Sequence, residues 1–248
     1  MTSSHPELPA RLWLVRHAES TGNVARQAAL EAGSTTIALS GRDADVPLSP
    51  AGITQANALG NWFGALDAKP DIVLTSPYKR AYDTAAQIAQ RCGLARDAVK
   101  LDERLREKEF GVIDGLTRAG IEERYPEVAA SRTSLGKFYH RPPGGESWCD
   151  VILRLRSLLA SLYLEYADRH VVIVSHQVVV LCMRYLLEDL TEDGILAIDR
   201  EGDVLNCAIT DYTRIDGALR LERYNWVAPV AEAGAPITAE PDRGDKTA

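Results

Sequence analysis

Two arginines and two histidines each follow a short apolar run in this sequence. They are Arg16 and His17 after residues 11–15 (RLWLV), Arg80 after residues 71–75 (DIVLT) and His176 after residues 170–175 (HVVIVS). Arginine guanidinium groups bind small oxyanions such as phosphate in a planar, two-pronged geometry. A neutral histidine can act as a nucleophile through one ring nitrogen while the other is held by a hydrogen bond. These side chains would suit phosphoryl transfer if the fold gathers them.

Strand-like and helix-like segments alternate along most of the chain. The expected strands are 11–15, 71–75, 99–101 and 170–175, and the expected helices are 49–66, 76–92, 148–166 and 177–190, the first two opened by a Ser-Pro pair. This alternation predicts a three-layer α/β fold, with a mainly parallel sheet and helices on both faces. Ligands bind at the carboxyl ends of the strands in such sheets, where the four side chains would lie. Asp216-Gly217, between two strand-like segments, predicts a closing antiparallel hairpin.

One domain is expected over residues 11–227. Residues 1–10 are predicted to be a flexible N-terminus. The charged and aromatic segment 102–147 is predicted to be a lid-like insertion over one end of the sheet. Residues 228–248, rich in Ala, Gly, Pro and charge, are predicted to be a disordered tail.

Composition narrows the class of partner. The 248 residues carry a formal net charge of -7, which argues against a general nucleic-acid binder, so any anion site must be a local cluster of positive charge. No apolar run approaches the roughly 20 residues that span a bilayer, and no signal-like start is present, so a cytoplasmic protein without a membrane partner is expected. No metal or other cofactor is expected, because no histidine or cysteine pair has metal-ligand spacing. The oligomeric state is left open, with a homodimer among the options.

Hydrolysis of a phosphate monoester also needs a proton for the departing oxygen, which calls for a carboxylic acid near the site. Glu107 is the candidate, because it follows the third expected strand. Partial burial and nearby phosphate charge would raise its pKa enough for donation near neutrality. Spacing alone does not distinguish it from Glu103 or Glu109.

Residues 14–23 (LVRHAESTGN) resemble the signature of the histidine phosphatase superfamily, also called phosphoglycerate mutase-like. In that signature an Arg-His-Gly or Arg-His-Ala core is followed by Glu or Gln, by Ser or Thr, and by a later Asn. The resemblance continues in the family's order through 47–52 (PLSPAG) with Gln55, 75–77 (TSP) with Arg80 and Thr84, 105–107 (LRE) and Ser175-His176. It covers about residues 11–224.

The resemblance implies a phosphoglycerate mutase-like fold and a role for each matched residue. His17 would be the phosphorylated nucleophile, Arg16, Arg80 and His176 the phosphate pocket, Asn23 a further phosphate contact and Glu107 the proton donor. The implied reaction is a metal-independent, two-step hydrolysis of a phosphate monoester, in which water releases phosphate from the phosphohistidine. The implied substrate is a small phosphorylated metabolite, with sugar phosphates among the candidates.

Residues 111–177 are more particularly similar to the fructose-2,6-bisphosphatase branch, through 125–127 (YPE), 143–147 (PGGES) and His176-Gln177. On an alignment with a one-residue gap, Arg132, Lys137 and Gln177 match positions that hold the sugar bisphosphate in that branch. Arg118 and Trp148 stand where the branch has tyrosines, and Leu181 stands where it has an arginine. Because Leu181 replaces an arginine of that branch, the second phosphate site lacks one cation, which argues against a bisphosphate substrate.

Two alternative functions stay open. A phosphoglycerate mutase uses the same pocket but returns the phosphoryl group to the substrate. Mutases are less similar here, since they have Glu-Arg-His-Tyr-Gly around position 107 and Gly-Asn where this chain has Gln177-Val178. The other alternative is a non-catalytic phospho-ligand binding protein, because some superfamily members keep the pocket and lose the chemistry.

Overall fold

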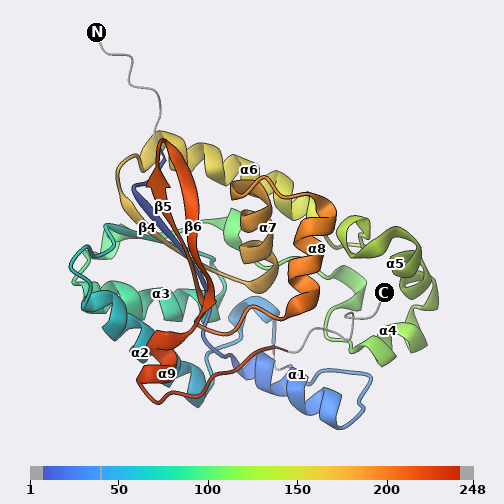
Figure 1. Cartoon of the computed structure of the whole chain (residues 1–248). Helices are drawn as coiled ribbons and strands as arrows, with labels where there is room; N and C mark the ends of the chain where they lie inside the picture. Colours follow the sequence, from blue (N-terminus) through green and yellow to red (C-terminus); the bar gives the residue numbers. More distant parts are fainter. Residues whose placement is uncertain (1–7, 40, 241–248) are drawn as a thin grey trace.

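A mixed six-stranded sheet organises the computed structural model, which describes residues 8–39 and 41–240 (Figure 1). The strands are β1 (Arg11–Arg16), β2 (Ile72–Thr75), β3 (Val99–Leu101), β4 (His170–Ser175), β5 (Ile209–Ile215) and β6 (Ala218–Trp226). Their order is β3-β2-β4-β1-β5-β6. The first four strands in this order are parallel, and β5 and β6 are antiparallel to their neighbours. The predicted mainly parallel α/β sheet is confirmed.

Helices cover both faces of this sheet. The helices are α1 (Thr21–Glu31), α2 (Pro50–Gly64), α3 (Lys79–Cys92), α4 (Arg118–Arg124), α5 (Pro126–Tyr139), α6 (Trp148–Glu165), α7 (Gln177–Leu187), α8 (Glu192–Glu201) and α9 (Ala228–Glu232). Successive strand residues point to opposite faces, so Leu12 and Leu14 pack with α6 and α7, whereas Trp13 and Val15 pack with α2, α3 and α9. Two hydrophobic cores, one on each face, hold the strands in place.

The register of the central strands brings three chain segments to one edge. Arg16 at the end of β1 pairs with Ser175 at the end of β4, and Thr75 of β2 pairs with Val174. The backbone N–H of His17 donates to the Ser175 carbonyl at 2.9 Å, which extends the ladder one residue past the strand. The residues that follow β1, β2 and β4 are therefore fixed beside one another at the carboxyl edge.

The predicted hairpin is confirmed: Asp216 (φ 51°) and Gly217 (φ 77°) join β5 to β6 with both residues in the left-handed region. The helix expected from Ser76 instead begins at Lys79, and the Ser76 hydroxyl contacts the Tyr78 backbone N–H at 3.2 Å and His176 Nε2 at 2.8 Å. The helix expected over 177–190 ends at Leu187, and α8, which the sequence does not predict, follows it.

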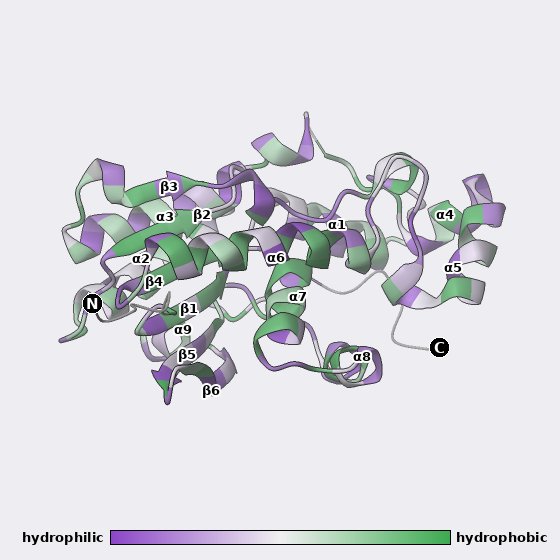
Figure 2. Ribbon diagram, turned by 90° about the horizontal axis from the view of Figure 1, so that it is seen from above, coloured by the Kyte–Doolittle hydropathy of each residue, from purple (hydrophilic) through white to green (hydrophobic). Residues whose placement is uncertain are grey.

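The segment 102–147 contains α4 and α5, which lie at one end of the sheet (Figure 2). Gly111 fastens this region to the segment before α6. Its φ of 56° favours glycine, and a Cβ at this position would lie 2.1 Å from the carbonyl oxygen of Pro143. Only glycine fits this close approach of two backbone segments.

The end of the described chain departs from the predicted disorder. Residues 228–232 form α9, Ala235 is buried against the core, and the Pro236 carbonyl accepts a hydrogen bond from Gln55 Nε2 at 2.8 Å. The prediction of a disordered tail is therefore wrong for residues 228–240, while residues 241–248 lie outside the described residues. Of the predicted flexible N-terminus, residues 1–7 also lie outside, and Leu8 is buried.

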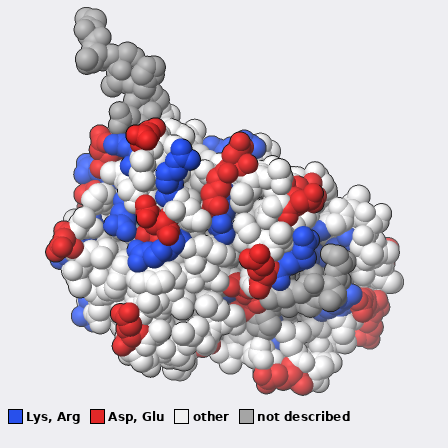
Figure 3. Space-filling view, in the orientation of Figure 1, with Lys and Arg blue, Asp and Glu red and all other residues white. Residues whose placement is uncertain are grey.

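Charged side chains of both signs lie on the surface. On the face drawn in Figure 3, basic and acidic side chains are interspersed rather than gathered into a basic patch. Among the described helices, none has the length and apolar character that a bilayer crossing requires.

Candidate active site

The side chains at the carboxyl edge form one compact cluster. The rings of His17 and His176 have centroids 5.1 Å apart. Arg80 Nε lies 3.3 Å from His17 Nε2, and Glu107 Oε2 lies 3.7 Å from His176 Nδ1. Arg80, Glu107 and both histidines thus contact one another in one cluster, although His17 and His176 are 159 residues apart in the sequence.

The protonation of His17 follows from its hydrogen bonds. Nδ1 lies 2.7 Å from the Ala18 carbonyl oxygen, which can only accept, so Nδ1 carries the proton. Nε2 therefore holds the lone pair and accepts from Arg80. Burial, with Arg80 and Arg16 close by, lowers the pKa of His17 well below its ordinary value. The ring is neutral at neutral pH, with its unprotonated nitrogen directed at a guanidinium group.

The loop after β1 is braced by α2 and α3. The backbone N–H of Glu19 donates to Gln55 Oε1 at 2.8 Å, and that of Ala18 donates to Thr84 Oγ1 at 3.1 Å. A Cβ on Gly52 would lie 1.9 Å from the Glu19 carbonyl oxygen, so glycine lets the start of α2 press against the loop. The motif residues Gly52, Gln55 and Thr84 therefore position His17 without touching its ring.

Asn23 is oriented by a capping box at the start of α1. Its Oδ1 accepts from the Ser20 backbone N–H at 2.8 Å, and its own N–H donates to Ser20 Oγ at 3.2 Å. With Oδ1 so engaged, the Nδ2 group is directed into the cavity as a donor. This geometry fits the contact to phosphate that the sequence predicts for Asn23.

Arg16 is held from the side of α7. Its Nη1 donates to Gln177 Oε1 at 3.1 Å and also to the Val204 carbonyl, while Gln177 Nε2 donates to Asp203 Oδ1 at 3.3 Å. Gln177, predicted to bind substrate, therefore lies in the cluster and contacts Arg16 directly.

Glu107 has the environment of a general acid. Burial raises its pKa to about 7, against the opposing effects of the Lys108 backbone N–H, 2.7 Å from Oε1, and of Arg80. A carboxyl group with this pKa is partly protonated at neutral pH. Glu107 also differs in its burial from the other two candidates, Glu103 and Glu109, which are both exposed.

His176 is neutral as well. Burial, with Arg80 and His17 nearby, lowers its pKa well below the ordinary value. Its Nε2 shares a hydrogen bond of 2.8 Å with Ser76 Oγ, the residue that follows β2. His176 can therefore serve as an uncharged hydrogen-bond donor to a bound oxyanion once its partner is displaced.

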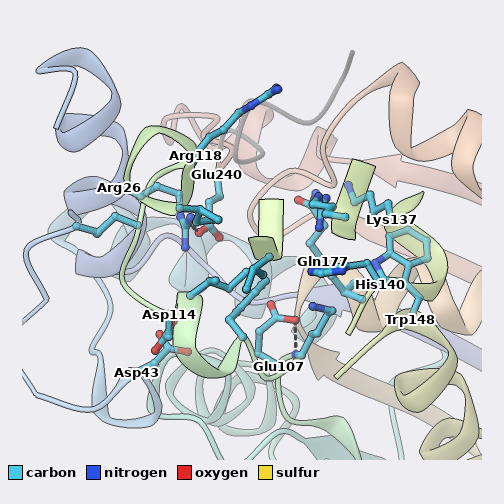
Figure 4. A pocket seen from close by; sticks show the side chains of 18 of the residues that line it. Arg26, Asp43, Glu107, Asp114, Arg118, Lys137, His140, Trp148, Gln177 and Glu240 are labelled. Atoms are coloured by element: carbon cyan, nitrogen blue, oxygen red, sulfur yellow. Dashed lines mark hydrogen bonds and ion pairs between the residues drawn. The ribbon is translucent and has the colours of Figure 1, made fainter. Parts of the chain in front are cut away.

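A cavity of about 360 Å³ opens beside this cluster and is also lined by residues of α4 and α5; Figure 4 shows side chains on its walls. Of the predicted site residues, its walls include Asn23, Arg80, Glu107, Arg132, Lys137 and Gln177. Arg118 and Trp148 also line it, whereas Leu181 lies in the hydrophobic core. The cavity thus joins the cluster of arginines and histidines to α4 and α5.

Lys137 is engaged with another helix rather than directed at the histidines. Its Nζ lies 2.6 Å from Asp199 Oδ2 of α8 and 5.6 Å from the centre of the Trp148 ring. Arg132, on the wall of the same cavity, comes from α5. Arg132 and Lys137, predicted from the bisphosphatase-like alignment to bind substrate, therefore lie at the α5 end of the cavity, and Lys137 is already paired with a carboxylate.

Three functional candidates in this site are absent from the sequence prediction. Asp43 Oδ1 and Oδ2 each lie 3.0 Å from a guanidinium nitrogen of Arg80. Glu240 Oε2 lies 2.9 Å from Arg16 Nη2, and Arg26 forms an ion pair with Glu240 Oε1 (Figure 4). Arg26 could have been noticed, since it stands three residues after Asn23 on the same helix face. Asp43 and Glu240 lie in segments without periodicity.

Among the described residues, no group of three His, Cys, Asp or Glu side chains is arranged to hold a metal ion. The positive charge of the cluster comes from Arg16, Arg26 and Arg80. Arginine forks of this kind suit a tetrahedral oxyanion, and the neutral Nε2 of His17 beside them suits attack on phosphorus.

Comparison with known proteins places this geometry in context. A family model described as the histidine phosphatase superfamily (branch 1) matches residues 12–227. The chain is 30% identical over 208 residues to glucosyl-3-phosphoglycerate phosphatase of Mycobacterium tuberculosis, covering 79% of this chain and 87% of that protein. The native structure of the mycobacterial glucosyl-3-phosphoglycerate phosphatase superposes with a TM-score of 0.69 at 30% identity, covering 87% of this chain and 98% of that one.

A second relative bears on the similarity seen in residues 111–177. The chain is 30% identical over 176 residues to 6-phosphofructo-2-kinase/fructose-2,6-bisphosphatase of Caenorhabditis elegans, covering 71% of this chain and 34% of that protein. The match thus spans about a third of that larger protein.

Proposed function

Because the chain belongs to branch 1 of the histidine phosphatase superfamily, we propose that it hydrolyses phosphate monoesters through a phosphohistidine on His17. The observation that carries this proposal is the fixed tautomer of His17. Its Nδ1 proton is held by the Ala18 carbonyl, and its Nε2 lone pair faces Arg80. A neutral, oriented imidazole next to a guanidinium is the arrangement that in-line attack on a bound phosphoryl group requires.

In the first step, Nε2 of His17 attacks phosphorus and the bond between phosphorus and the ester oxygen breaks. The proton on Glu107 moves to the departing oxygen, so the alcohol leaves uncharged. The pKa of Glu107, raised by burial to about 7, supports this role. Arg16, Arg80 and His176 hold the phosphoryl oxygens as charge redistributes during the transfer.

In the second step, the Glu107 carboxylate accepts a proton from water as the water oxygen attacks the phosphohistidine. The bond between phosphorus and Nε2 breaks, inorganic phosphate leaves, and His17 and Glu107 return to their starting protonation states. We propose that no metal takes part, since arginines supply the positive charge that phosphoryl transfer needs.

The proposed substrate is a small phosphorylated metabolite whose leaving group fills the cavity beneath the lid. The named substrate of the mycobacterial relative, a glycosylated phosphoglycerate, is one member of this class. Apolar side chains such as Ile113, Val128 and Trp148 line the lid end of the cavity together with Arg132. We propose that residues 11–227 act as one catalytic domain with segment 102–147 as its lid, which selects the leaving group.

A substrate panel tests the proposal. Phosphate release would be measured for sugar monophosphates, sugar bisphosphates, phosphoglycerates, glycosylated phosphoglycerates and nucleotides. In parallel, conversion of 3-phosphoglycerate to 2-phosphoglycerate would be followed. Phosphate release that depends on His17 supports hydrolysis. Isomerisation without release would instead indicate a mutase, and binding without turnover across the panel would indicate a non-catalytic ligand-binding protein.

A further inference from the structure

We infer that Arg26 is a further anion-binding residue of this site, an inference that rests on the proposed function. Arg26 lies one turn after Asn23 in α1, so the two side chains share a helix face. Its side chain is 14% exposed and lines the cavity. A largely buried guanidinium on the wall of a phosphate-binding cavity is placed to bind an oxyanion of the substrate.

The carboxylate of Glu240 marks where such an oxyanion lies. Glu240 Oε2 accepts from Arg16 Nη2 and from Asn23 Nδ2, each at 2.9 Å, and Oε1 forms the ion pair with Arg26. Arg16 and Asn23 are both expected to contact phosphate. An anion that replaces this carboxylate would therefore find Arg26 as a third donor, either for a phosphoryl oxygen or for an acidic group on the leaving group.

Equilibrium binding distinguishes whether Arg26 binds a phosphoryl oxygen or an acidic group on the leaving group. Arg26→Gln, made in a Glu240→Gln background so that the internal carboxylate charge is absent, should raise the Kd for inorganic phosphate about tenfold if Arg26 binds phosphoryl oxygens. If it binds an acidic leaving group, the Kd for phosphate stays constant and the KM for 3-phosphoglycerate rises instead. Arg91→Gln, an exposed arginine on α3, is the matched control. Unchanged values for both ligands would overturn the inference.

A second inference rests on how the segment before Glu240 is anchored. Gln55 Nε2 donates to the Pro236 carbonyl and to Thr238 Oγ1, both at 2.8 Å. The backbone N–H of Asn206 donates to the Thr238 carbonyl at 2.9 Å, and Asn206 Nδ2 donates to the His17 carbonyl at 3.0 Å. The segment is thus bound to Gln55 and Asn206, which also contact the loop that carries His17.

We propose that Glu240 is an intramolecular competitor for the phosphoryl group, so that substrate binds only after its carboxylate leaves the site. His17 and Arg16 are each 1% exposed, and His176 is 0% exposed. With Arg16 Nη2 and Asn23 Nδ2 both donating to Glu240 Oε2, a phosphoryl group can bind these donors only in place of the carboxylate. Release of residues 236–240 would uncover Arg16, Asn23 and Arg26 together.

The charge of Glu240 is maintained at physiological pH. Burial disfavours its ionised form, but Arg26 and Arg16 outweigh this effect and lower the pKa of Glu240 to about 2. Competition between its carboxylate and phosphate is therefore a competition between two anions for the same guanidinium groups. This competition lowers the apparent affinity for phosphate. The apparent affinity equals the affinity of the open site multiplied by the fraction of molecules in which the site is open.

Glu240→Gln tests the competitor directly, and Glu240→Ala serves as a second variant. Either change should lower the Kd for inorganic phosphate, measured by titration calorimetry, by at least about threefold. Glu232→Gln, an exposed glutamate in α9, is the matched control. Thermal unfolding would confirm that each variant is folded. An unchanged or increased Kd in both Glu240 variants would overturn the proposal. Since this binding measurement needs no turnover, its failure is distinguishable from failure of the proposed hydrolysis.

Discussion

Nε of Arg80 lies 3.3 Å from Nε2 of His17, on the side of the ring away from the hydrogen bond between Nδ1 and the Ala18 carbonyl. The nitrogen with the lone pair and the guanidinium that would hold the phosphoryl group are thus already paired. A phosphoryl group bound by Arg80 would therefore lie beside the nitrogen that attacks it. Such preorganisation is the main source of catalysis in phosphoryl transfer.

Glu107→Gln tests the proton donor. The variant cannot protonate the leaving oxygen, so kcat for an alkyl phosphate should fall by about 10²–10⁴. The loss for p-nitrophenyl phosphate should be much smaller, because its leaving group is a stable anion. Glu103→Gln, at an exposed position, is the control and should leave both rates unchanged. Equal losses on the two substrates would contradict the assignment of Glu107 as the acid.

The pH profile provides a separate test of the same residue. Transfer to His17 needs Glu107 protonated, and burial raises its pKa to about 7, so kcat/KM for an alkyl phosphate should decline as the pH rises through about 7. Because the pKa of His17 is lowered, the nucleophile stays neutral well below pH 6.5 and activity should persist there. A decline at high pH that is unchanged in Glu107→Gln would point to another group.

Arg80→Lys tests whether the planar guanidinium group of Arg80 is needed in addition to its charge. Lysine keeps the charge but loses the planar pair of donors and the Nε–H directed at His17, so kcat/KM should fall at least about tenfold. Arg91→Lys, on the same helix, should have no effect on kcat/KM. Full activity in Arg80→Lys would mean that charge alone suffices at this position.

Removal of metals should not change the rate. Exhaustive dialysis against EDTA is expected to leave turnover of p-nitrophenyl phosphate intact, because Arg16 and Arg80 supply the positive charge. Loss of activity that a divalent cation restores would show that the proposed scheme lacks a component.

Much of the site could be predicted from local patterns, because strand ends in a parallel sheet meet at one edge. Arg16, His17 and His176 each follow an apolar run, and the registers of β1 and β4 place them together. Glu107 could not be chosen from spacing, since its burial depends on how segment 102–147 packs. The family resemblance selected it, and its burial supports that selection.

The two carboxylates that face the arginines could not be predicted. Asn23 and Glu240 are 217 residues apart, and no periodic pattern links a tail residue to a helix start. Composition alone predicted disorder for this segment, whereas specific contacts with Gln55 define its path. The helix predicted over 177–190 is too long, because Leu190 follows the apolar residues of α7 in sequence while Asp189, with φ 51°, breaks the helical backbone.

The most direct test is to trap the phosphorylated enzyme. The protein would be mixed with excess substrate, quenched in alkali within one turnover, and digested for peptide mass spectrometry. We expect one phosphoryl group on His17, stable in base and lost in acid, and none in His17→Asn. Phosphate release from the wild-type protein with no phosphorylated His17 at any time within the first turnover would contradict the phosphohistidine mechanism.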